Sequence, residues 1–392
     1  MKILQLANFY HPRSGGLRTA IDALAQGYTA AGHDVSLVVP GAARDLRRTD
    51  DRTVVTLRGP RLPRSGGYRT ILGQRAVHEV VRRLDPDVIE LSDKTTLARA
   101  VAVMPDRPPV VVFSHERLDR VVAQHVPGSS STAGRVASLT DRWTRRALHG
   151  ADALVCASQF ASSEFDRLAA TPSARRVPAV RLIPLGVDLE RFTPAARSDT
   201  AALAQLPPRR PGVARCVYVG RLSPEKHPGD ALDAVQRVHE TRRHVELVIA
   251  GDGPLRPELE RAAAGSPVTF LGHVVDRRVI ASLIADADVA IAPSPNETFG
   301  LAALEAMAAG TPVVAVAGGA VAEIVVPGAG AIGHSGANGL AAACVQLLDG
   351  DRARHRAAAR ARAEEFPWTR TIDSMLALFR EVAAARPARL AS

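Results

Sequence analysis

The sequence predicts an α/β protein of two domains, each built on a parallel β-sheet with helices on both faces. Its 392 residues exceed what one hydrophobic core usually supports. Short apolar runs alternate with helical patterns along both halves, which is typical of βαβ units whose strands are buried on both faces. A proline-rich stretch without periodicity separates the halves. Two doubly wound domains are therefore expected.

The first expected domain covers residues 1–186. Its strands are the apolar runs Ile3–Ala7, Asp34–Val39, Thr53–Leu57, Asp87–Leu91, Pro109–Phe113, Ala153–Ala157 and Val180–Pro184. A helix is expected from Leu17 to Ala31, and Gly15 and Gly16 then lie at its N-terminus. Glycines at such a turn let backbone amides approach a phosphate, although a glycine pair also occurs in ordinary turns.

The second expected domain covers residues 213–367 and follows a linker at 187–212. Its strands are Ala214–Val219, Val245–Ala250, Val268–Leu271, Asp288–Pro293, Thr311–Val316 and Ala329–Ile332. Helices are expected at Pro228–Thr241 and Phe299–Ala309. A last apolar helix is expected at residues 368–386, starting at Trp368.

Composition narrows the class of partner. The formal net charge is +10, yet only Lys2, Lys94 and Lys226 are lysines, so arginine enrichment supplies most of the charge and much of it belongs to a solvated surface. Aromatic residues make up 4% and form no stacking platform, so nucleic acid is not expected as a partner. An anionic nucleotide or membrane surface fits the charge better.

The sequence carries no obvious membrane or export segment. No apolar run reaches the ~18 residues of a spanning helix, and the N-terminus is a strand without signal-peptide anatomy. We therefore expect a cytoplasmic protein, with the inner face of the membrane as a second location. The three cysteines are widely spaced among apolar neighbours and are expected to be reduced core thiols.

Two surface segments have no clear periodicity. The basic loop Arg58–Arg69 is followed by a helix with Arg75, Arg82 and Arg83, where an acceptor or an anionic membrane would dock. The alternative is a solvated loop, because a run of charge needs no partner. Residues 126–135 are also expected to form a loop.

The richest stretch is Ser294–Pro312, a predicted turn from a buried strand into a helix. Amides of Phe299, Gly300 and Leu301 at the helix N-terminus suit a phosphate. Glu297 lies at that entrance, and Glu305 follows eight residues later, near the same helix face but roughly 12 Å further along. They would offer two carboxylates to one ligand. The alternative is that Glu297 is an ordinary carboxylate of the first helical turn and Glu305 a solvated surface residue, which is the more frequent case for two isolated glutamates at this spacing.

Two other strand ends carry candidate residues. Arg221 and Lys226 lie in the turn Gly220–His227, where two cations would hold a diphosphate, unless they are solvated loop residues. His115 follows directly on a buried strand, and ligands of open α/β sheets bind beyond the carboxyl ends of the strands.

The segment Gly272–Asp276 is a candidate base-binding strand end. Backbone groups of Val274 and the Asp276 carboxylate would recognise the edge of a guanine, but Asp276 would equally cap the next helix. Asp286 and Asp288 form a D-x-D sequence at a helix end, which we interpret as structural, and no metal ion is expected.

Pro293–Ala315 and Gly220–Lys226 resemble the motifs of the retaining family 4 glycosyltransferases, which carry an E-x7-E pair and a G-R-L-x-x-E-K turn. The resemblance implies the GT-B fold, in which two Rossmann-like domains face a cleft and a C-terminal helix crosses back to the first domain. It implies that the first domain binds the acceptor and the second a nucleotide-diphosphate sugar, without a cofactor.

The resemblance also implies individual roles. His115 would face the donor sugar, Glu297 would hold sugar hydroxyls, Glu305 would hold the ribose, and Arg221 and Lys226 would stabilise the departing diphosphate. Front-face attack by a hydroxyl acceptor is implied, because no carboxylate is placed as a covalent nucleophile.

The nearest subgroup by resemblance contains GDP-mannose-dependent α-mannosyltransferases, including those that act on phosphatidylinositol lipids. The expected activity is therefore hexosyl transfer, with mannose as donor sugar and a lipid or glycolipid acceptor. Two alternatives remain at this point, a UDP-sugar-dependent transferase of the same fold and a sugar-nucleotide epimerase or hydrolase.

Overall fold

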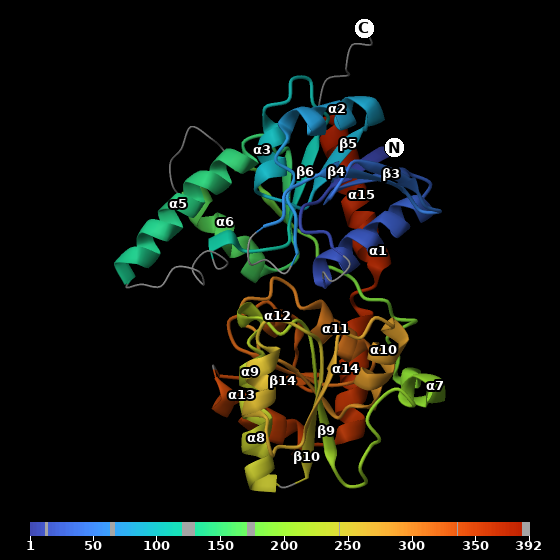
Figure 1. The fold of residues 1–392 in the computed structure, drawn as a ribbon, viewed down its shortest axis with the longest axis vertical. Helices are drawn as coiled ribbons and strands as arrows, with labels where there is room; N and C mark the ends of the chain where they lie inside the picture. Colours follow the sequence, from blue (N-terminus) through green and yellow to red (C-terminus); the bar gives the residue numbers. More distant parts are fainter. Residues whose placement is uncertain are drawn as a thin grey trace. The chain divides into compact units, whose positions relative to one another are not determined.

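The computed structural model describes residues 1–11, 15–62, 67–119, 130–170, 177–242, 244–334 and 336–385. The chain divides into two compact units (Figure 1). Unit 1 contains Met1–Pro184 together with Trp368–Ser392, and unit 2 contains Leu185–Pro367. Assignment of an acceptor to the first and a donor to the second remains a prediction.

Unit 1 is built on an eight-stranded sheet in the order β3-β4-β2-β1-β5-β6-β7-β8. The strands are β1 (Lys2–Leu6), β2 (Asp34–Gly41), β3 (Asp45–Arg48), β4 (Thr53–Arg58), β5 (Val88–Leu91), β6 (Val110–Ser114), β7 (Ala153–Cys156) and β8 (Val180–Leu182). All neighbours are parallel except β3 and β4. The order reverses between β1 and β5, and in such sheets ligands bind at the carboxyl ends beside this switch point.

Helices cover both faces of this sheet. They are α1 (Gly16–Ala30), α2 (Gln74–Leu84), α3 (Thr96–Ala102), α5 (Ser130–Leu148), α6 (Gln159–Ala170) and α15 (Trp368–Ala384). Side chains of α2, α3 and α6 share one core with the strands, while Ile21 of α1 packs on the opposite face with Leu37 and Val39.

The C-terminal helix α15 completes unit 1 by packing on α1. Tyr28 meets Phe379 edge-on, with ring centroids 5.5 Å apart. A Cβ on Gly27 would lie 2.1 Å from Ile372, so the two helices approach closely only because this residue has no side chain. The return of the last helix to the first unit agrees with the expected fold.

Unit 2 is built on a six-stranded, fully parallel sheet in the order β11-β10-β9-β12-β13-β14. The strands are β9 (Ala214–Val219), β10 (Val245–Ala250), β11 (Val268–Gly272), β12 (Val289–Ala292), β13 (Val313–Val316) and β14 (Gly330–Gly333). This is the strand order of a dinucleotide-binding Rossmann sheet, with its switch point between β9 and β12.

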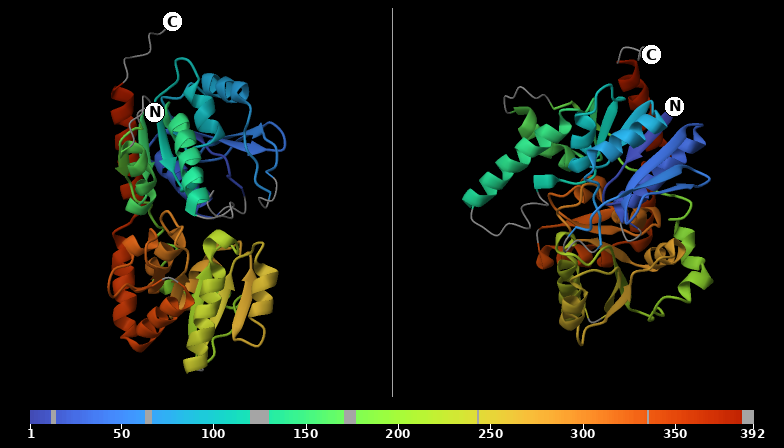
Figure 2. Two further views of the ribbon diagram at one scale, coloured as in Figure 1. Left: turned by 90° about the vertical axis from the view of Figure 1, so that its left-hand side faces the viewer. Right: turned by 45° about the horizontal axis from the view of Figure 1, so that its top comes forward.

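Helices lie on both sides of the second sheet, as the left view of Figure 2 shows. They are α8 (Pro228–Arg242), α9 (Arg256–Ala262), α10 (Arg277–Asp286), α11 (Leu301–Ala308), α12 (Val321–Ile324), α13 (Ala337–Asp349) and α14 (Arg352–Glu364). Helices α8 and α13 pack together on one face, and α10, α11 and α14 pack on the other.

Residues 187–212 contain two short helical segments, η1 (Pro194–Ser198) and α7 (Thr200–Leu203). They pack against α10, where the Ser282 hydroxyl donates to the carbonyl of Ala196 at 2.9 Å and Arg278 pairs with Asp199. The segment is therefore attached to unit 2 along its length.

Three local expectations need correction. Helix α11 begins at Leu301 rather than Phe299, because Gly300 takes a left-handed conformation (φ 96°) that interrupts the helix. Helix α5 already begins at Ser130, so residues 130–135 are not a loop, and 126–129 lie outside the described residues. The antiparallel edge strand β3 was missed because its four residues are all exposed and lack an apolar pattern.

Candidate functional site

The site in unit 2 begins with the turn that leaves β9. Gly220, Leu222 and Gly251 are tied to the neighbouring strand ends by backbone hydrogen bonds of 2.8–3.0 Å. The φ of Gly251 is 157°, and a Cβ on this residue would lie 1.8 Å from the carbonyl oxygen of Gly220. Glycine is required there, because any side chain would separate the turns after β9 and β10.

Lys226 and Glu297 meet at the centre of this site. The Lys226 Nζ donates to Glu297 Oε1 at 2.7 Å, and the two side chains remain 33% and 28% exposed. Lys226 ends a short 3₁₀ turn, η2 (Pro224–Lys226), whose Glu225 carbonyl accepts from the Ser294 hydroxyl at 2.7 Å. The turns after β9 and β12 are thus joined at the switch point of the sheet.

Arg221 lies in the same turn and is half-buried. The buried Tyr218 hydroxyl donates to its carbonyl at 2.9 Å, which fixes the backbone from which the guanidinium extends. Arg221 and Lys226 therefore extend from one turn, which agrees with the sequence prediction.

The turn after β12 brings Glu297 to the N-terminus of α11. The Glu297 carbonyl accepts from the amide of Ala320 at 3.3 Å, which links this turn to the loop after β13. A Cβ on Gly300 would lie 2.5 Å from Val321, so the loop and the helix N-terminus pack directly. Amides of the first turn of α11, starting at Leu301, have the orientation that favours an anion.

The ring of Phe299 is buried within unit 2. Its side chain is 4% exposed and its ring lies edge-on to Phe366, with centroids 6.2 Å apart. Its contribution is to pack the turn that carries Glu297.

Glu305 lies within α11, whereas Glu297 precedes it, so the expected shared helix face is wrong. Glu305 is 5% exposed and forms an ion pair with Arg277, whose guanidinium stacks 4.9 Å from the ring centroid of Phe192. Burial raises the pKa of Glu305, and the Arg277 charge opposes that rise. The alternative of a solvated surface carboxylate is also wrong.

Asp276 caps helix α10. Its Oδ1 accepts from the amide of Arg278 at 2.8 Å, while the residue stays exposed. Val274 is half-buried beside it. The capping role is therefore present, and the carboxylate remains exposed.

The Asp286 and Asp288 pair is structural, as expected. The buried Arg215 binds Asp286 at 2.9 Å through its guanidinium and Asp288 at 2.8 Å through its amide. Arg209 and Arg352 also pair with Asp288. Within the described ranges, no group of three or more His, Cys, Asp or Glu residues is arranged to hold a metal ion.

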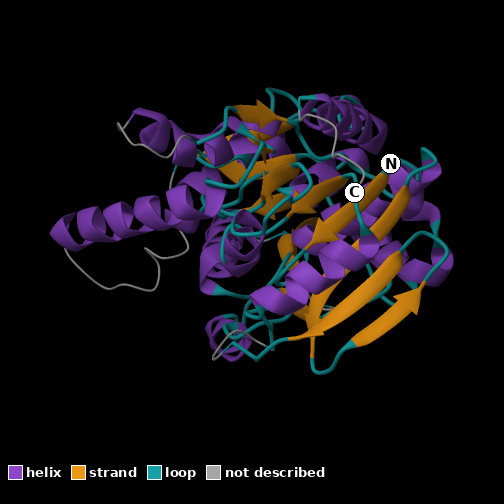
Figure 3. Cartoon of the chain, turned by 90° about the horizontal axis from the view of Figure 1, so that it is seen from above, coloured by secondary structure: helices purple, strands orange, loops and turns teal. Residues whose placement is uncertain are grey.

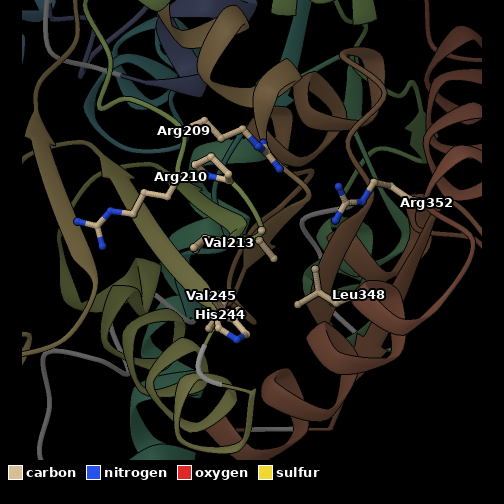
Figure 4. A pocket seen from close by; sticks show the side chains of 10 residues that line it. Arg209, Arg210, Val213, His244, Val245, Leu348 and Arg352 are labelled. Atoms are coloured by element: carbon tan, nitrogen blue, oxygen red, sulfur yellow. The ribbon is translucent and has the colours of Figure 1, made fainter.

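A separate cavity of about 590 Å³ lies at the opposite end of this sheet (Figure 4). It is lined by the amino-terminal ends of β9 and β10, with Arg209, Arg210, His244 and Arg352 at its wall. We place the site at the carboxyl ends instead, because that edge carries the turns with Arg221, Lys226 and Glu297 beside the switch point.

In unit 1 the corresponding edge carries His115. Its imidazole stacks on Phe113, with ring centroids 4.4 Å apart and planes inclined by 21°. Burial, and to a lesser degree the Lys94 charge, lowers the pKa of His115 to about 4, although the residue keeps some solvent contact. The imidazole is therefore neutral at pH 7.

A buried ion pair supports the His115 loop, and sequence reasoning missed it. Lys94 Nζ binds Glu164 Oε2 and the carbonyl of Glu116, both at 2.6 Å. The other carboxylate oxygen of Glu164 accepts from the amide of Leu118 at 3.1 Å. The two side chains are 6% and 3% exposed. One indication of this pair was present in the sequence, because Lys94 is one of only three lysines in the chain and follows the expected strand 87–91.

Asn8 and Asp93 organise the switch point between β1 and β5. Both are buried, and Asn8 Nδ2 donates to Asp93 Oδ2 at 2.8 Å while Asn8 Oδ1 accepts from the amide of Ile71 at 2.9 Å. Asp93 also accepts from the amides of Thr95 and Leu97. This network was likewise not predicted, because Asn8 is 85 residues from Asp93 and 63 residues from Ile71 in sequence.

Gly15 and Gly16 lie at the start of α1, as expected. Among the described residues, no heavy atom would lie within 4 Å of a Cβ on Gly15. Arg75, Arg82 and Arg83 of α2 are exposed, whereas residues 63–66 of the basic loop lie outside the described residues. No helix of the described part of the chain is both long and apolar enough to cross a bilayer.

The two strand-end sites differ in their chemistry. Unit 2 offers two cations, a helix N-terminus and a carboxylate, a set that binds the phosphates and hydroxyls of a phosphorylated sugar. Unit 1 offers a neutral imidazole on a rigid loop.

Comparison with known proteins agrees with this chemistry. Residues 14–191 match the family described as Glycosyltransferase Family 4, and residues 214–350 match Glycosyl transferases group 1. A GDP-mannose-dependent alpha-(1-6)-phosphatidylinositol dimannoside mannosyltransferase of Mycobacterium tuberculosis (strain ATCC 25177 / H37Ra) is 41% identical over 96% of this chain and 95% of its own length.

Other relatives are more distant. A D-inositol 3-phosphate glycosyltransferase of Xylanimonas cellulosilytica is 36% identical over 61% of this chain and 59% of its own. The structure of a sucrose-phosphate synthase from Thermosynechococcus elongatus is 22% identical and superimposes with a TM-score of 0.75 over 98% of this chain and 100% of its own. The fold is therefore GT-B, and the chain belongs to the family 4 glycosyltransferases.

Proposed function

We propose that this enzyme transfers mannose from GDP-mannose to a mannosylated phosphatidylinositol lipid, with retention at the anomeric carbon. The substrates are those in the name of the mycobacterial relative, which aligns over nearly the whole of both chains. The observation that carries the proposal is the Lys226–Glu297 pair at the switch point of the second sheet.

The pair fits a donor that has an anionic and a neutral part. Lys226 and Arg221 would bind the diphosphate, together with the first-turn amides of α11. Glu297 would accept hydrogen bonds from hydroxyls of the sugar. Because the two side chains are already joined at 2.7 Å, the diphosphate and the sugar would be held next to each other at the bond that breaks.

The transfer step needs no covalent intermediate with the protein. The bond between the anomeric carbon and the diphosphate oxygen breaks, and its electron pair leaves with the phosphate, where the two cations stabilise the growing charge. The acceptor oxygen forms the new bond on the same face, and its proton passes to the departing phosphate oxygen. The neutral His115 would contact the donor sugar without acting as an acid.

Asp276 would select the base. Guanine presents an N1–H and an exocyclic amine to a carboxylate, which uracil does not. The cap bond to Arg278 occupies Oδ1, so recognition would use the remaining oxygen together with backbone groups of Val274.

The test is a donor panel with purified full-length protein. GDP-mannose, UDP-glucose and UDP-galactose are incubated with and without phosphatidylinositol dimannoside, and nucleotide release and the lipid product are measured. The proposal predicts acceptor-dependent release from GDP-mannose and an α-linked product by NMR. Preferential use of a UDP-sugar would overturn the donor assignment, and an altered sugar without acceptor would indicate an epimerase.

A further inference from the structure

The exposed face of α5 combines apolar and basic side chains. Leu139 is 63% exposed and Trp143, one turn later, is 39% exposed. Arg142, Arg146 and His149 are also exposed. Successive helical residues turn by about 100°, so the four positions within α5 fall on one stripe, and His149 follows directly after the helix. None of the exposed residues between 139 and 149 is acidic.

The opposite face of the helix holds it to unit 1. Thr140, Thr144, Ala147 and Leu148 are all at most 6% exposed, and Arg145 donates to the carbonyl of Leu168 on α6. The tryptophan is therefore displayed outward by a packed helix. Figures 1 and 3 show α5 extending beyond the other helices of its unit.

Leu139 and Trp143 are the one pair of large exposed apolar residues that share a helix in the part of the chain that the structure describes. The other large exposed apolar residues, Leu46, Leu72, Val103, Leu182, Val275 and Ile332, lie on separate elements. Isolated exposed apolar residues are ordinary on soluble proteins, whereas Trp and Leu beside arginines are typical of helices that lie in a membrane interface.

We propose that the α5 face formed by Leu139, Arg142, Trp143 and Arg146 docks on the surface of an anionic lipid bilayer. The indole and the leucine would enter the boundary between headgroups and acyl chains, and the guanidiniums would contact lipid phosphates. A second copy of the chain fits less well, because stable protein interfaces bury about 800 Å² per partner over 20–30 residues, far more than this stripe offers. This proposal does not depend on which sugar donor the enzyme uses. The α5 face is also a different surface from the one that Arg75, Arg82 and Arg83 form on α2.

Tryptophan fluorescence tests this contact directly, because the chain has two tryptophans, Trp143 and Trp368. The full-length Trp368→Phe protein, whose remaining indole is Trp143, is mixed with vesicles of phosphatidylcholine or of an equal mixture with phosphatidylglycerol. A blue shift is expected with the anionic vesicles and should weaken with added salt. An unchanged spectrum overturns the proposal.

Co-sedimentation with the same vesicles locates the surface. Arg142→Ser with Arg146→Ser should weaken binding about 30-fold, since each basic residue near an anionic surface contributes about fivefold. Leu139→Ser with Trp143→Ser should weaken it at least as much. The matched control, Leu46→Ser with Arg48→Ser on the exposed strand β3, should bind like the unmodified protein.

Two further outcomes overturn the proposal. One is loss of binding in Arg75→Ser/Arg82→Ser/Arg83→Ser while the α5 variants still bind. The other is a change in oligomeric state of the α5 variants without a change in vesicle binding, which would make the face a contact between copies. Unchanged melting temperatures would exclude unfolding as the cause of a loss.

Discussion

Among the described residues, two lysine–glutamate pairs show how burial gives similar contacts different roles. Lys94–Glu164 in unit 1 and Lys226–Glu297 in unit 2 have N–O distances of 2.6 and 2.7 Å, and both lie at the carboxyl edge of a sheet. The first pair is 6% and 3% exposed, and the second is 33% and 28% exposed. Lys94–Glu164 therefore has a structural role, whereas Lys226–Glu297 is accessible to a ligand.

The partners of the buried pair support this difference. Glu164 and Lys94 use their remaining hydrogen-bonding capacity on the backbone of residues 116 and 118, so they fix the loop that carries His115. A buried pair of this kind is costly to break, because removal of one member leaves an uncompensated charge. An exposed pair loses little, because water replaces the partner.

The largest expected effect is a loss of protein stability when the buried pair is broken. Lys94→Met should lower the free energy of unfolding by about 3–5 kcal/mol, because Glu164 would remain buried and unpaired. The matched Lys226→Met should lower it by less than about 1 kcal/mol. Urea denaturation of both variants measures this difference, and equal losses would show that burial does not separate the pairs.

The second effect is kinetic and belongs to the exposed site. Lys226→Ala and Arg221→Ala should each reduce kcat about 100-fold or more, because a preorganised donor to a developing anion contributes ~3 kcal/mol in the transition state. Steady-state kinetics in folded protein would reveal it. If only KM for the donor rises and kcat is unchanged in both, these residues bind the ground state and are not the leaving-group clamp.

A smaller effect is expected at Asp276. Asp276→Ala removes a helix cap and should cost roughly 1 kcal/mol of stability, and it should also weaken GDP more than UDP. Asp351→Ala is the control, because Asp351 caps α14 in the same way, with Oδ1 accepting from the amide of Arg354 at 3.1 Å. Equal loss of GDP and UDP affinity in the Asp276 variant would leave only the capping role.

The sequence predicted the strands and turns that carry the site in unit 2, but it did not predict the buried pair in unit 1. Apolar runs located β9 and β10 to the residue, because strands buried on both faces have continuous apolar sequences. Strand-end turns then placed Arg221, Lys226 and Glu297 at one edge. Lys94 and Glu164 are 70 residues apart, so their pairing depends on how β5 and α6 pack and no local pattern announces it. The shared helix face expected for Glu297 and Glu305 was wrong, because the left-handed conformation of Gly300 interrupts the helical rotation between them.

Glu297→Gln tests the central claim most directly, that the exposed pair joins the sugar to its leaving diphosphate. The substitution keeps the shape of the side chain and removes its charge, so Lys226 stays available to the phosphates. Steady-state transfer from GDP-mannose and calorimetric binding of GDP should be measured on the same preparation. We expect kcat to fall about 100-fold or more while the Kd for GDP is unchanged or lower. Undiminished transfer, or a loss of GDP affinity that parallels the loss of kcat, would contradict the account.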